Sequence, residues 1–196
     1  MKNIATLTLP LFFFAFCLFL GACSKDDNQP AIIIYPEENP LQEYITKANY
    51  ITPPTNFINT VSPYEMGFGF KPLFKGKINA LVIKIPDTNL NLRVTIWDKT
   101  TRTPIRTENV NVTASDTEIV KLIEPLQLKQ NKEYSITINT EDFYMYSDGN
   151  GNYPFTSGNI QILDFSDFPT LSQTFPTNFR TKLYYGNCSF KFQRTE

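Results

Sequence analysis

The sequence predicts an all-β protein, an antiparallel β-sandwich of jelly-roll or immunoglobulin-like topology. From about residue 56 onward, apolar and polar residues alternate in short runs, which is the period of a strand with one face buried and one in water. Turn-forming residues separate these runs at short intervals, and no segment after residue 55 has an apolar stripe of helical period. Many short strands at such spacing are typical of a sandwich.

The expected strands differ in how their apolar residues are placed. Residues 92–96 and 134–139 alternate cleanly, as half-buried strands do. Residues 78–85 are apolar on both faces, which predicts a central strand that is covered on both sides. In chain order, the expected strands are residues 65–71, 78–85, 92–96, 105–112, 119–123, 134–139, 158–165 and 180–192.

The first residues have the pattern of a secretory signal. Lys2 precedes an apolar stretch that contains no polar residue between Leu11 and Leu20, and small residues follow it. The exit reads Leu-Gly-Ala-Cys and ends at Cys23. It resembles the lipobox of bacterial lipoproteins, in which the cysteine thiol is acylated before cleavage. The resemblance implies a signal peptide over residues 1–22 and a lipid anchor at Cys23.

An uncleaved transmembrane anchor is the alternative for this segment. Thr6, Thr8 and Pro10 interrupt its first half, and no cluster of Lys or Arg follows it, so we favour the lipoprotein. The charged run at residues 24–28, Ser-Lys-Asp-Asp-Asn, resembles the surface-export signals of lipoproteins from the Bacteroidetes group. It implies an outer-membrane protein that faces the cell exterior, whereas a solvated linker is the simpler interpretation.

A spacer is expected between the anchor and the sandwich. Residues 24–54 hold five prolines, which fix φ and remove backbone donors, although residues 32–35 could form a short strand and residues 41–48 a helical turn or two. The expected parts are the signal peptide at 1–22, the spacer at 23–54 and one sandwich domain at 55–196. Removing Lys2 changes the balance from 18 positive and 19 negative residues to 17 and 19, a net charge of −2. Nucleic acid is therefore an unfavourable partner.

A family resemblance supports the same fold. Residues 65–72 read Glu-Met-Gly-Phe-Gly-Phe-Lys-Pro, and residues 76–81, 92–98 and 134–138 continue the pattern. Together they resemble a bacterial β-sandwich family of uncharacterised function, over about residues 64–165. That family occurs on secreted and cell-surface proteins, sometimes beside polysaccharide-processing enzymes. The resemblance implies a carbohydrate-binding or adhesive role, by analogy.

The residue types that are missing argue against catalysis. The chain has no histidine, which excludes His-based triads and His-based metal sites. Nucleotide-binding glycine motifs are also absent. Carboxylate catalysis requires two acids about 5–10 Å apart, and nothing in the sequence shows that any two converge, so a hydrolase is a remote alternative. The available acids are Glu141, Asp142, Asp148, Asp164 and Asp167.

One aromatic and polar stretch, residues 143–155, is the candidate ligand site. Two of its tyrosines, Tyr144 and Tyr146, lie two residues apart and share one strand face, beside amide and carboxylate groups. Flat rings suit the C–H faces of a sugar, and the polar groups suit its hydroxyls. The alternative is a hairpin loop whose tyrosines cover the end of the sandwich. The candidate ligand-binding residues are Tyr144, Tyr146, Asp148, Asn150, Asn152, Tyr153 and Trp97.

Three of these candidates have further interpretations. Asp148, Asn150 and Asn152 alternate as in calcium loops, but the glycine and glutamate positions of an EF-hand are not matched, so we expect no metal. Trp97 falls on the polar face of its strand and is either an exposed sugar platform or, as we favour, packed under a loop. Cys188 is expected to be a buried, inert thiol.

The leading hypothesis is therefore a surface lipoprotein with a non-catalytic sandwich that binds glycan and needs no cofactor. The competing hypothesis is a structural or protein-interaction subunit of a cell-envelope assembly, such as an adhesin.

Overall fold

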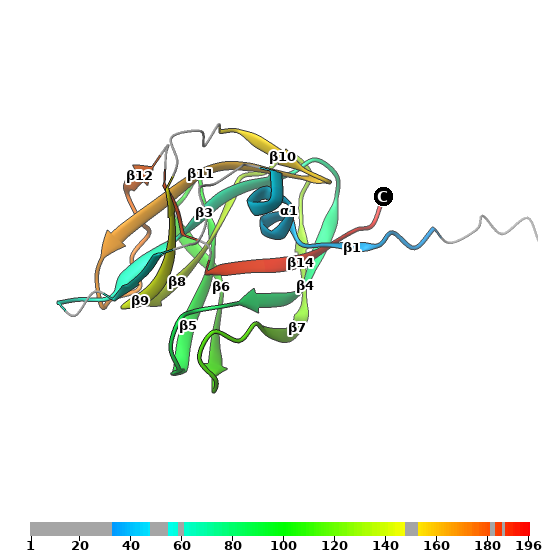
Figure 1. Ribbon diagram of the computed structural model, residues 1–196. Coiled ribbons are helices and arrows are strands. Elements are labelled where there is room, and N and C mark those ends of the chain that lie inside the picture. Colours follow the sequence, from blue (N-terminus) through cyan, green and yellow to red (C-terminus); the bar gives the residue numbers. More distant parts are fainter. Residues whose placement is uncertain (1–32, 48–54, 59–60, 148–152, 181–182, 186) are drawn as a thin grey trace, which may run out of the picture. The chain divides into compact units, whose positions relative to one another are not determined.

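The computed structural model describes residues 33–47, 55–58, 61–147, 153–180, 183–185 and 187–196 (Figure 1). Residues Ile34–Glu196 form one compact unit. Its elements are β1 (Glu37–Glu38), α1 (Pro40–Lys47), β2 (Thr55–Ile58), β3 (Tyr64–Pro72), β4 (Gly76–Ile83), β5 (Asn89–Asp98), β6 (Thr103–Val112), β7 (Ile119–Leu128), β8 (Tyr134–Thr140), β9 (Asp142–Ser147), β10 (Phe155–Ser157), β11 (Ile160–Pro169), β12 (Asn178–Arg180), β13 (Leu183–Tyr185) and β14 (Cys188–Arg194).

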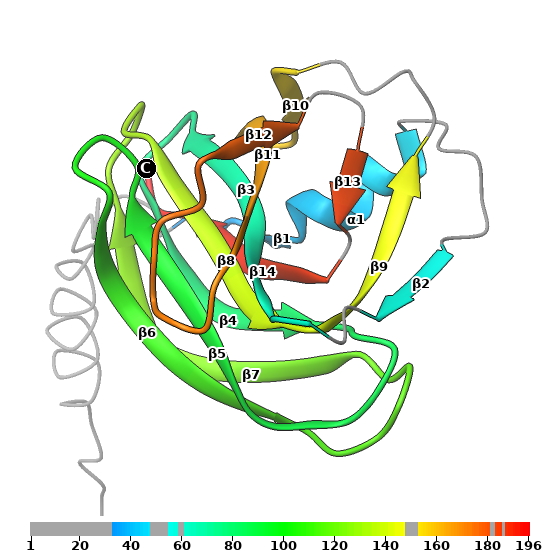
Figure 2. The same cartoon turned by 90° about the vertical axis from the view of Figure 1, so that its left-hand side faces the viewer.

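Two antiparallel sheets face each other across the core. The larger sheet has the order β10-β11-β3-β8-β5-β6, with β12 paired to β11, and the smaller has the order β1-β14-β4-β7. Figure 2 shows β6, β5, β8 and β3 curving in front of β7, β4 and β14. A third sheet, β13-β9-β2, lies beside them. The predicted antiparallel sandwich is confirmed.

The core follows from strand alternation. In β3, Met66, Phe68 and Phe70 are buried in the core, while the residues between them face the other way. Phe190 of β14 meets this row from across the sandwich, and its ring centre lies 4.6 Å from that of Phe70 and 6.0 Å from that of Phe68. Strand β4, predicted to be central, runs between β14 and β7 and is buried on both faces over its second half.

The predicted spacer differs from the structure in part, because β1 and α1 belong to the compact unit. Strand β1 pairs with β14. Helix α1 begins with Pro40, and Asn39 precedes it as the cap, its side-chain oxygen accepting from the Gln42 N–H at 3.4 Å. Proline at the first helical position and asparagine at the cap both favour a helix start. Tyr44 on its inner face is fully buried, so packing stabilises this short helix.

The predicted strand at residues 180–192 is divided in the structure. Its first residue ends β12, and β13 and β14 follow as separate strands. Asn187 lies between them and is buried. Its side chain bonds to the backbone of β9 rather than continuing a ladder.

One segment of the described chain crosses the outer face of the larger sheet. Residues 170–177, which join β11 to β12 and which we call the strap, run over β8 and β5 as the orange trace in Figure 2. Asn139 of β8 and Arg93 of β5 each donate a hydrogen bond to a strap carbonyl. The polar face that the sequence placed toward water is therefore partly covered.

Candidate functional site

Strand β9 carries the two tyrosines that the sequence singled out. Tyr146 pairs with Tyr184 of β13, and the two ring centres lie 5.2 Å apart. Tyr144 is 7% exposed, and its hydroxyl donates to the carboxylate of Asp116. Tyr144 is therefore a largely buried, partnered residue, whereas Tyr146 is the half-buried one.

Asn187 holds this strand in place. Its side-chain oxygen accepts from the Tyr144 N–H at 2.8 Å, and its amide donates to the Tyr144 carbonyl at 3.3 Å. Its own backbone carbonyl accepts from the Lys84 N–H at 3.0 Å. A side-chain amide that mimics a peptide pair therefore links β9 to the end of β4 and to the start of β14.

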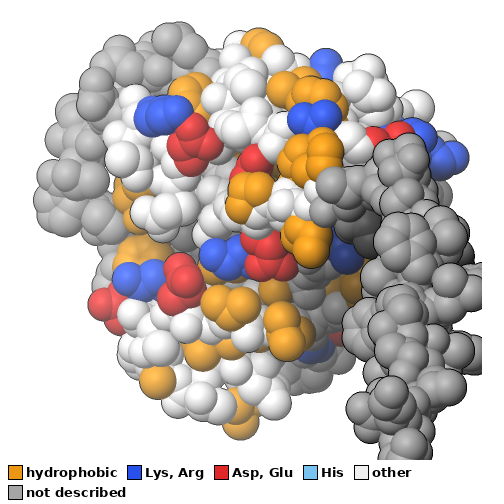
Figure 3. All heavy atoms as spheres, turned by 90° about the vertical axis from the view of Figure 1, so that its right-hand side faces the viewer, with side chains coloured by type: hydrophobic (Ala, Val, Ile, Leu, Met, Phe, Trp, Pro, Cys, Tyr) orange, Lys and Arg blue, Asp and Glu red, His pale blue; other side chains and the backbone are white. Residues whose placement is uncertain are grey.

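A hollow of about 270 Å³ lies between α1, β4 and β14, and Tyr146 forms part of its wall. We call it the α1 hollow. Its apolar lining comes from Leu41, Ile45 and Val82, and its polar lining includes Gln42, Lys84 and Glu118. Figure 3 shows the α1 side of the folded unit, where hydrophobic, basic and acidic side chains are interspersed over the described surface. The hollow thus combines one aromatic wall, aliphatic groups and both signs of charge.

Lys84, which lines the hollow, is paired with an acid. Lys84 Nζ lies 3.0 Å from Asp116 Oδ1 and 5.7 Å from the centre of the Tyr144 ring. The hydrogen bond from Tyr144, followed by that from Lys84, lowers the pKa of Asp116. Burial, followed by the hydrogen bond to Asp116, raises the pKa of Tyr144. Tyr144 is therefore protonated and donating at neutral pH.

Tyr153 belongs to a different part of the same aromatic cluster. Its hydroxyl accepts a hydrogen bond of 2.8 Å from Tyr44, and the two rings stack with centres 5.6 Å apart. Tyr44 also packs against Tyr184, the neighbour of Tyr146. The other predicted polar members, Asp148, Asn150 and Asn152, lie outside the described residues.

Trp97 is buried, so it is not an exposed platform in this structure. It is 2% exposed, and its indole N–H donates to the Thr137 hydroxyl at 2.8 Å. Phe175 of the strap covers it in an edge-on contact, with ring centres 5.7 Å apart. The packing that we favoured from the sequence is the arrangement found, and the strap is the reason.

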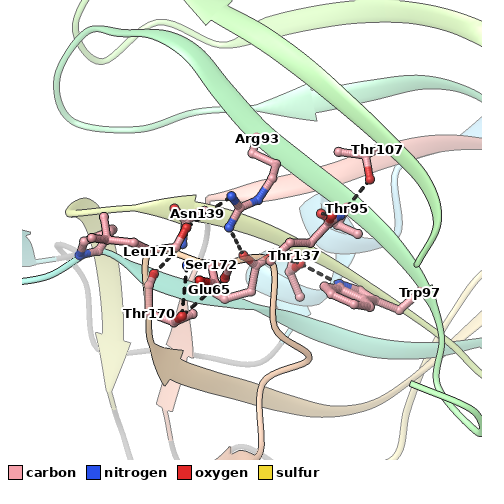
Figure 4. Close-up of polar contacts among 12 residues, drawn as sticks. Glu65, Arg93, Thr95, Trp97, Thr107, Thr137, Asn139, Thr170, Leu171 and Ser172 are labelled. Atoms are coloured by element: carbon pink, nitrogen blue, oxygen red, sulfur yellow. Dashed lines mark hydrogen bonds and ion pairs between the residues drawn. The ribbon is translucent and has the colours of Figure 1, made fainter. Parts of the chain in front are cut away.

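The Trp97 bond is the first link of a buried polar chain that the sequence did not indicate (Figure 4). Thr137 in turn donates to Glu65, whose side chain is fully buried. Arg93 Nη2 donates to the other oxygen of the same carboxylate at 2.8 Å. Burial raises the pKa of Glu65, and the bonds from Arg93 and Thr137 oppose that rise. An alternating pattern places such residues on the polar face but does not reveal what covers them.

A second cavity, of about 520 Å³, opens at the end of the sandwich, beside the same arginine. We call it the end cavity. It is lined mainly by amides and charged groups, among them Asn89, Asn91, Arg93, Asn139 and Asp142. Asp142 accepts a hydrogen bond from the Asp87 N–H, and burial raises its pKa.

The acids that the sequence made available for carboxylate catalysis do not form one group among the described residues. Glu141 and Asp142 both line the end cavity, whereas Asp164 pairs with Lys99 and Asp167 with Arg180; Asp148 lies outside the described residues. Within the described ranges, no three His, Cys, Asp or Glu side chains are grouped so that they could hold a metal ion.

Cys188 is the free cysteine among the described residues, and it shows no sign of activation. Cys188 is buried, and burial raises its thiol pKa, so it is the inert core residue that the sequence predicted. Cys23 lies outside the described residues. Among the residues that are described, no helix has the length and apolar character needed to cross a membrane.

Comparison with known proteins leaves the family open. No protein-family model matches the chain, and no curated protein matches it significantly. The resemblance to a cell-surface β-sandwich family therefore stays a prediction.

Proposed function

We propose that this chain is a lipoprotein of the outer membrane, anchored through Cys23 and facing the cell exterior, whose sandwich binds glycan in the α1 hollow without catalysis. The observation that carries the proposal is the composition of that hollow, in which the half-buried Tyr146 adjoins aliphatic and hydrogen-bonding groups. A sugar has the matching surface, because apolar C–H faces alternate with hydroxyls around its ring.

Each part of the hollow has a separate role in this proposal. Tyr146 packs on one face of the sugar ring, and Leu41 and Ile45 of α1 supply the remaining apolar contact. Gln42 and Glu118 take the hydroxyls. The volume of about 270 Å³ is just below the ~300–1,000 Å³ of small-molecule sites, so the hollow suits the end of a glycan or one of its branches.

The test is binding to a glycan array by full-length protein in detergent. Tyr146→Ala removes one ring contact, which is worth about 0.5–1.5 kcal/mol, so affinity should fall by about 2- to 12-fold. The matched control is Phe179→Ala, which removes a 50% exposed ring from β12 and should leave binding unchanged. Equal binding by all three proteins argues against the hollow as the site.

A second candidate function is a protein-interaction or structural subunit of a cell-envelope assembly. The free edge of β7 favours it, since β7 ends the smaller sheet and exposes Val120 and Leu122 at 49% and 79%. Exposed edge strands with apolar side chains pair with other chains. Co-purification of an envelope protein that is lost in Leu122→Asp, together with an array that shows no glycan, would support this function instead.

A further inference from the structure

The outer face of the larger sheet carries a row of polar and aromatic side chains that runs across three strands. Arg93 of β5 lies opposite Asn139 of β8, and Thr95 lies opposite Thr107 of β6, while Trp97 ends the row. Cross-strand neighbours share a face. The row therefore presents a guanidinium, an amide, two hydroxyls and an indole along one surface (Figure 4).

The strap itself contacts most of these side chains. Asn139 donates to the Thr170 carbonyl at 2.9 Å, and Arg93 donates to the Leu171 carbonyl at 3.3 Å. Gln173 donates to the hydroxyls of Thr95 and Thr107, at 3.1 and 2.7 Å. Together with the Phe175 ring on the indole, these contacts supply the same kinds of interaction that a bound molecule would make.

The covering layer is thin. Residues 171–174 are exposed, and Leu171 is 74% exposed, whereas Phe175 and Pro176 are the buried residues of the strap. Backbone bonds and strand pairing fix the strap at its two ends, and side-chain bonds and the Phe175 ring hold it between them. At one end, Thr170 N–H donates to the Pro63 carbonyl at 2.8 Å, and at the other, β12 pairs with β11. Lifting residues 171–177 off the sheet would break no strand pair, but it would break the bonds from Arg93 and Gln173 and uncover the Phe175 ring.

The end cavity gives access to this row. Arg93 and Asn139 line the cavity and also bond to the strap. The fully buried carboxylate of Glu65 holds the Arg93 guanidinium from behind, and Arg93 Nε has no hydrogen-bond partner among the described residues. A molecule that enters the end cavity therefore meets the first two members of the row before the strap moves.

We propose that the outer face of β8, β5 and β6 is a second glycan-binding surface, kept covered by the strap and uncovered when an oligosaccharide displaces it from the end cavity. This inference rests on the glycan-binding role proposed above, and it adds a surface separate from the α1 hollow. The row suits an uncharged glycan, because Glu65 already neutralises the Arg93 charge. It also suits a chain rather than a single sugar, since it crosses three strands spaced about 4.8 Å apart.

The strap is itself a peptide on this surface, but it is held there by side-chain bonds and one ring contact rather than by a strand ladder. An extended peptide is recognised through its backbone groups at a sheet edge. The outer face instead offers side-chain groups and one indole. Stacking on that ring and bonds from hydroxyl, amide and guanidinium groups are the interactions that a sugar chain uses.

Trp97 reports directly on the strap, because it is the single tryptophan of the chain. Gln173→Gly removes both bonds to the threonine hydroxyls at an exposed position, so the protein should fold while the open state becomes more populated. Acrylamide should then quench Trp97 emission more strongly than in the wild type. Apparent affinity for uncharged oligosaccharides on an array should rise at least threefold, in proportion to the open fraction. Ser172→Gly, which leaves both Gln173 bonds in place, is the matched control and should behave as the wild type.

The reverse test holds the strap closed. A short bis-maleimide bridge in the Thr107→Cys, Gln173→Cys double variant should lower oligosaccharide affinity at least tenfold, while the unbridged double variant keeps its binding. Cys188 is buried and should not react. Equal binding by the bridged and unbridged proteins, or Trp97 emission that does not change at saturating oligosaccharide, overturns the inference.

Failure here is distinguishable from failure of the α1 hollow. If Tyr146→Ala weakens binding and the bridge leaves it intact, the proposed function is kept and the second surface is overturned. If the bridge abolishes binding and Tyr146→Ala leaves it intact, the second surface is supported and the α1 hollow is excluded as the binding site. A Gln173→Gly protein that shows increased quenching and binds no uncharged oligosaccharide also overturns the second surface.

Discussion

The ion pair between Glu65 and Arg93 makes the sharpest prediction about stability. Arg93→Met keeps the length of the side chain and removes the guanidinium from a carboxylate that is fully buried. Removing one partner of a buried pair costs about 3–5 kcal/mol, because the other charge stays buried without compensation. For a chain of this size, about 1 kcal/mol shifts the melting temperature by roughly 2–4 °C. The Arg93→Met protein should therefore melt roughly 6–20 °C lower at pH 8.

The loss should depend on pH in a defined direction. Burial already raises the pKa of Glu65 in the wild type, and losing Arg93, which opposes that rise, raises it further. A carboxyl whose folded pKa is above its unfolded value stabilises the fold in its protonated form, and that stability is lost as pH rises through the folded pKa. The difference between variant and wild type should therefore shrink as pH is lowered toward the unfolded pKa, about 4.3.

Thermal unfolding followed by Trp97 emission at pH 5 and pH 8 measures both effects. Arg106→Met is the matched control, because its pair with Glu108 is partly exposed at 28% and 21% and exposed pairs contribute about 0–1 kcal/mol. Adding Glu65→Gln to Arg93→Met removes the uncompensated charge and should restore part of the loss. A variant within about 1 kcal/mol of the wild type at pH 8, or a loss that grows toward pH 5, would refute the reasoning.

Three further predictions concern Asn187, the contact between β3 and β8, and the lipid anchor. Asn187→Ala leaves the buried N–H and carbonyl of Tyr144 without their partner, so the free energy of unfolding in urea should fall by about 1–3 kcal/mol. An unchanged urea midpoint would show that Asn187 does not stabilise β9. Gly67→Ala places a methyl group 1.9 Å from the Ile136 carbonyl oxygen and should abolish soluble folded protein, as judged by circular dichroism, whereas a folded variant of native stability would show that β3 and β8 can separate there. Cys23→Ala should move the protein from the membrane to the soluble fraction in cell fractionation, since acyl chains give stable anchoring; continued membrane association, or mass spectrometry that finds unmodified Cys23, would count against lipidation.

Strand faces could be predicted because their cause is local. Side chains alternate with period two along a strand, so the run at residues 92–96 specified its own buried face, and Leu92, Val94 and Ile96 are buried in the core as expected. The two-sided apolar run at residues 78–85 likewise indicated a central strand, and β4 has neighbours on both sides. The proline-rich stretch before the sandwich was harder to interpret, since Pro40 starts a helix while proline is equally compatible with an extended chain.

The same reasoning predicted only part of the candidate site. Period two predicted that Tyr144 and Tyr146 share a face, but the partners of that face come from elsewhere, since Asp116 lies after β6 and Asn187 before β14. Glu65 and Arg93 stood at ordinary polar positions of two alternating strands, and nothing in either run shows that they form a buried pair.

By itself, the sequence determined the antiparallel sandwich and the two faces of its main strands, because a period of two residues is a local property of the chain. Only the tertiary structure decided what covers each face. Trp97 lies on a face predicted to be polar and is buried because Phe175, from a strap far along the chain, lies on it. Coverage depends on which distant segments the strand order brings together, and no local pattern specifies that.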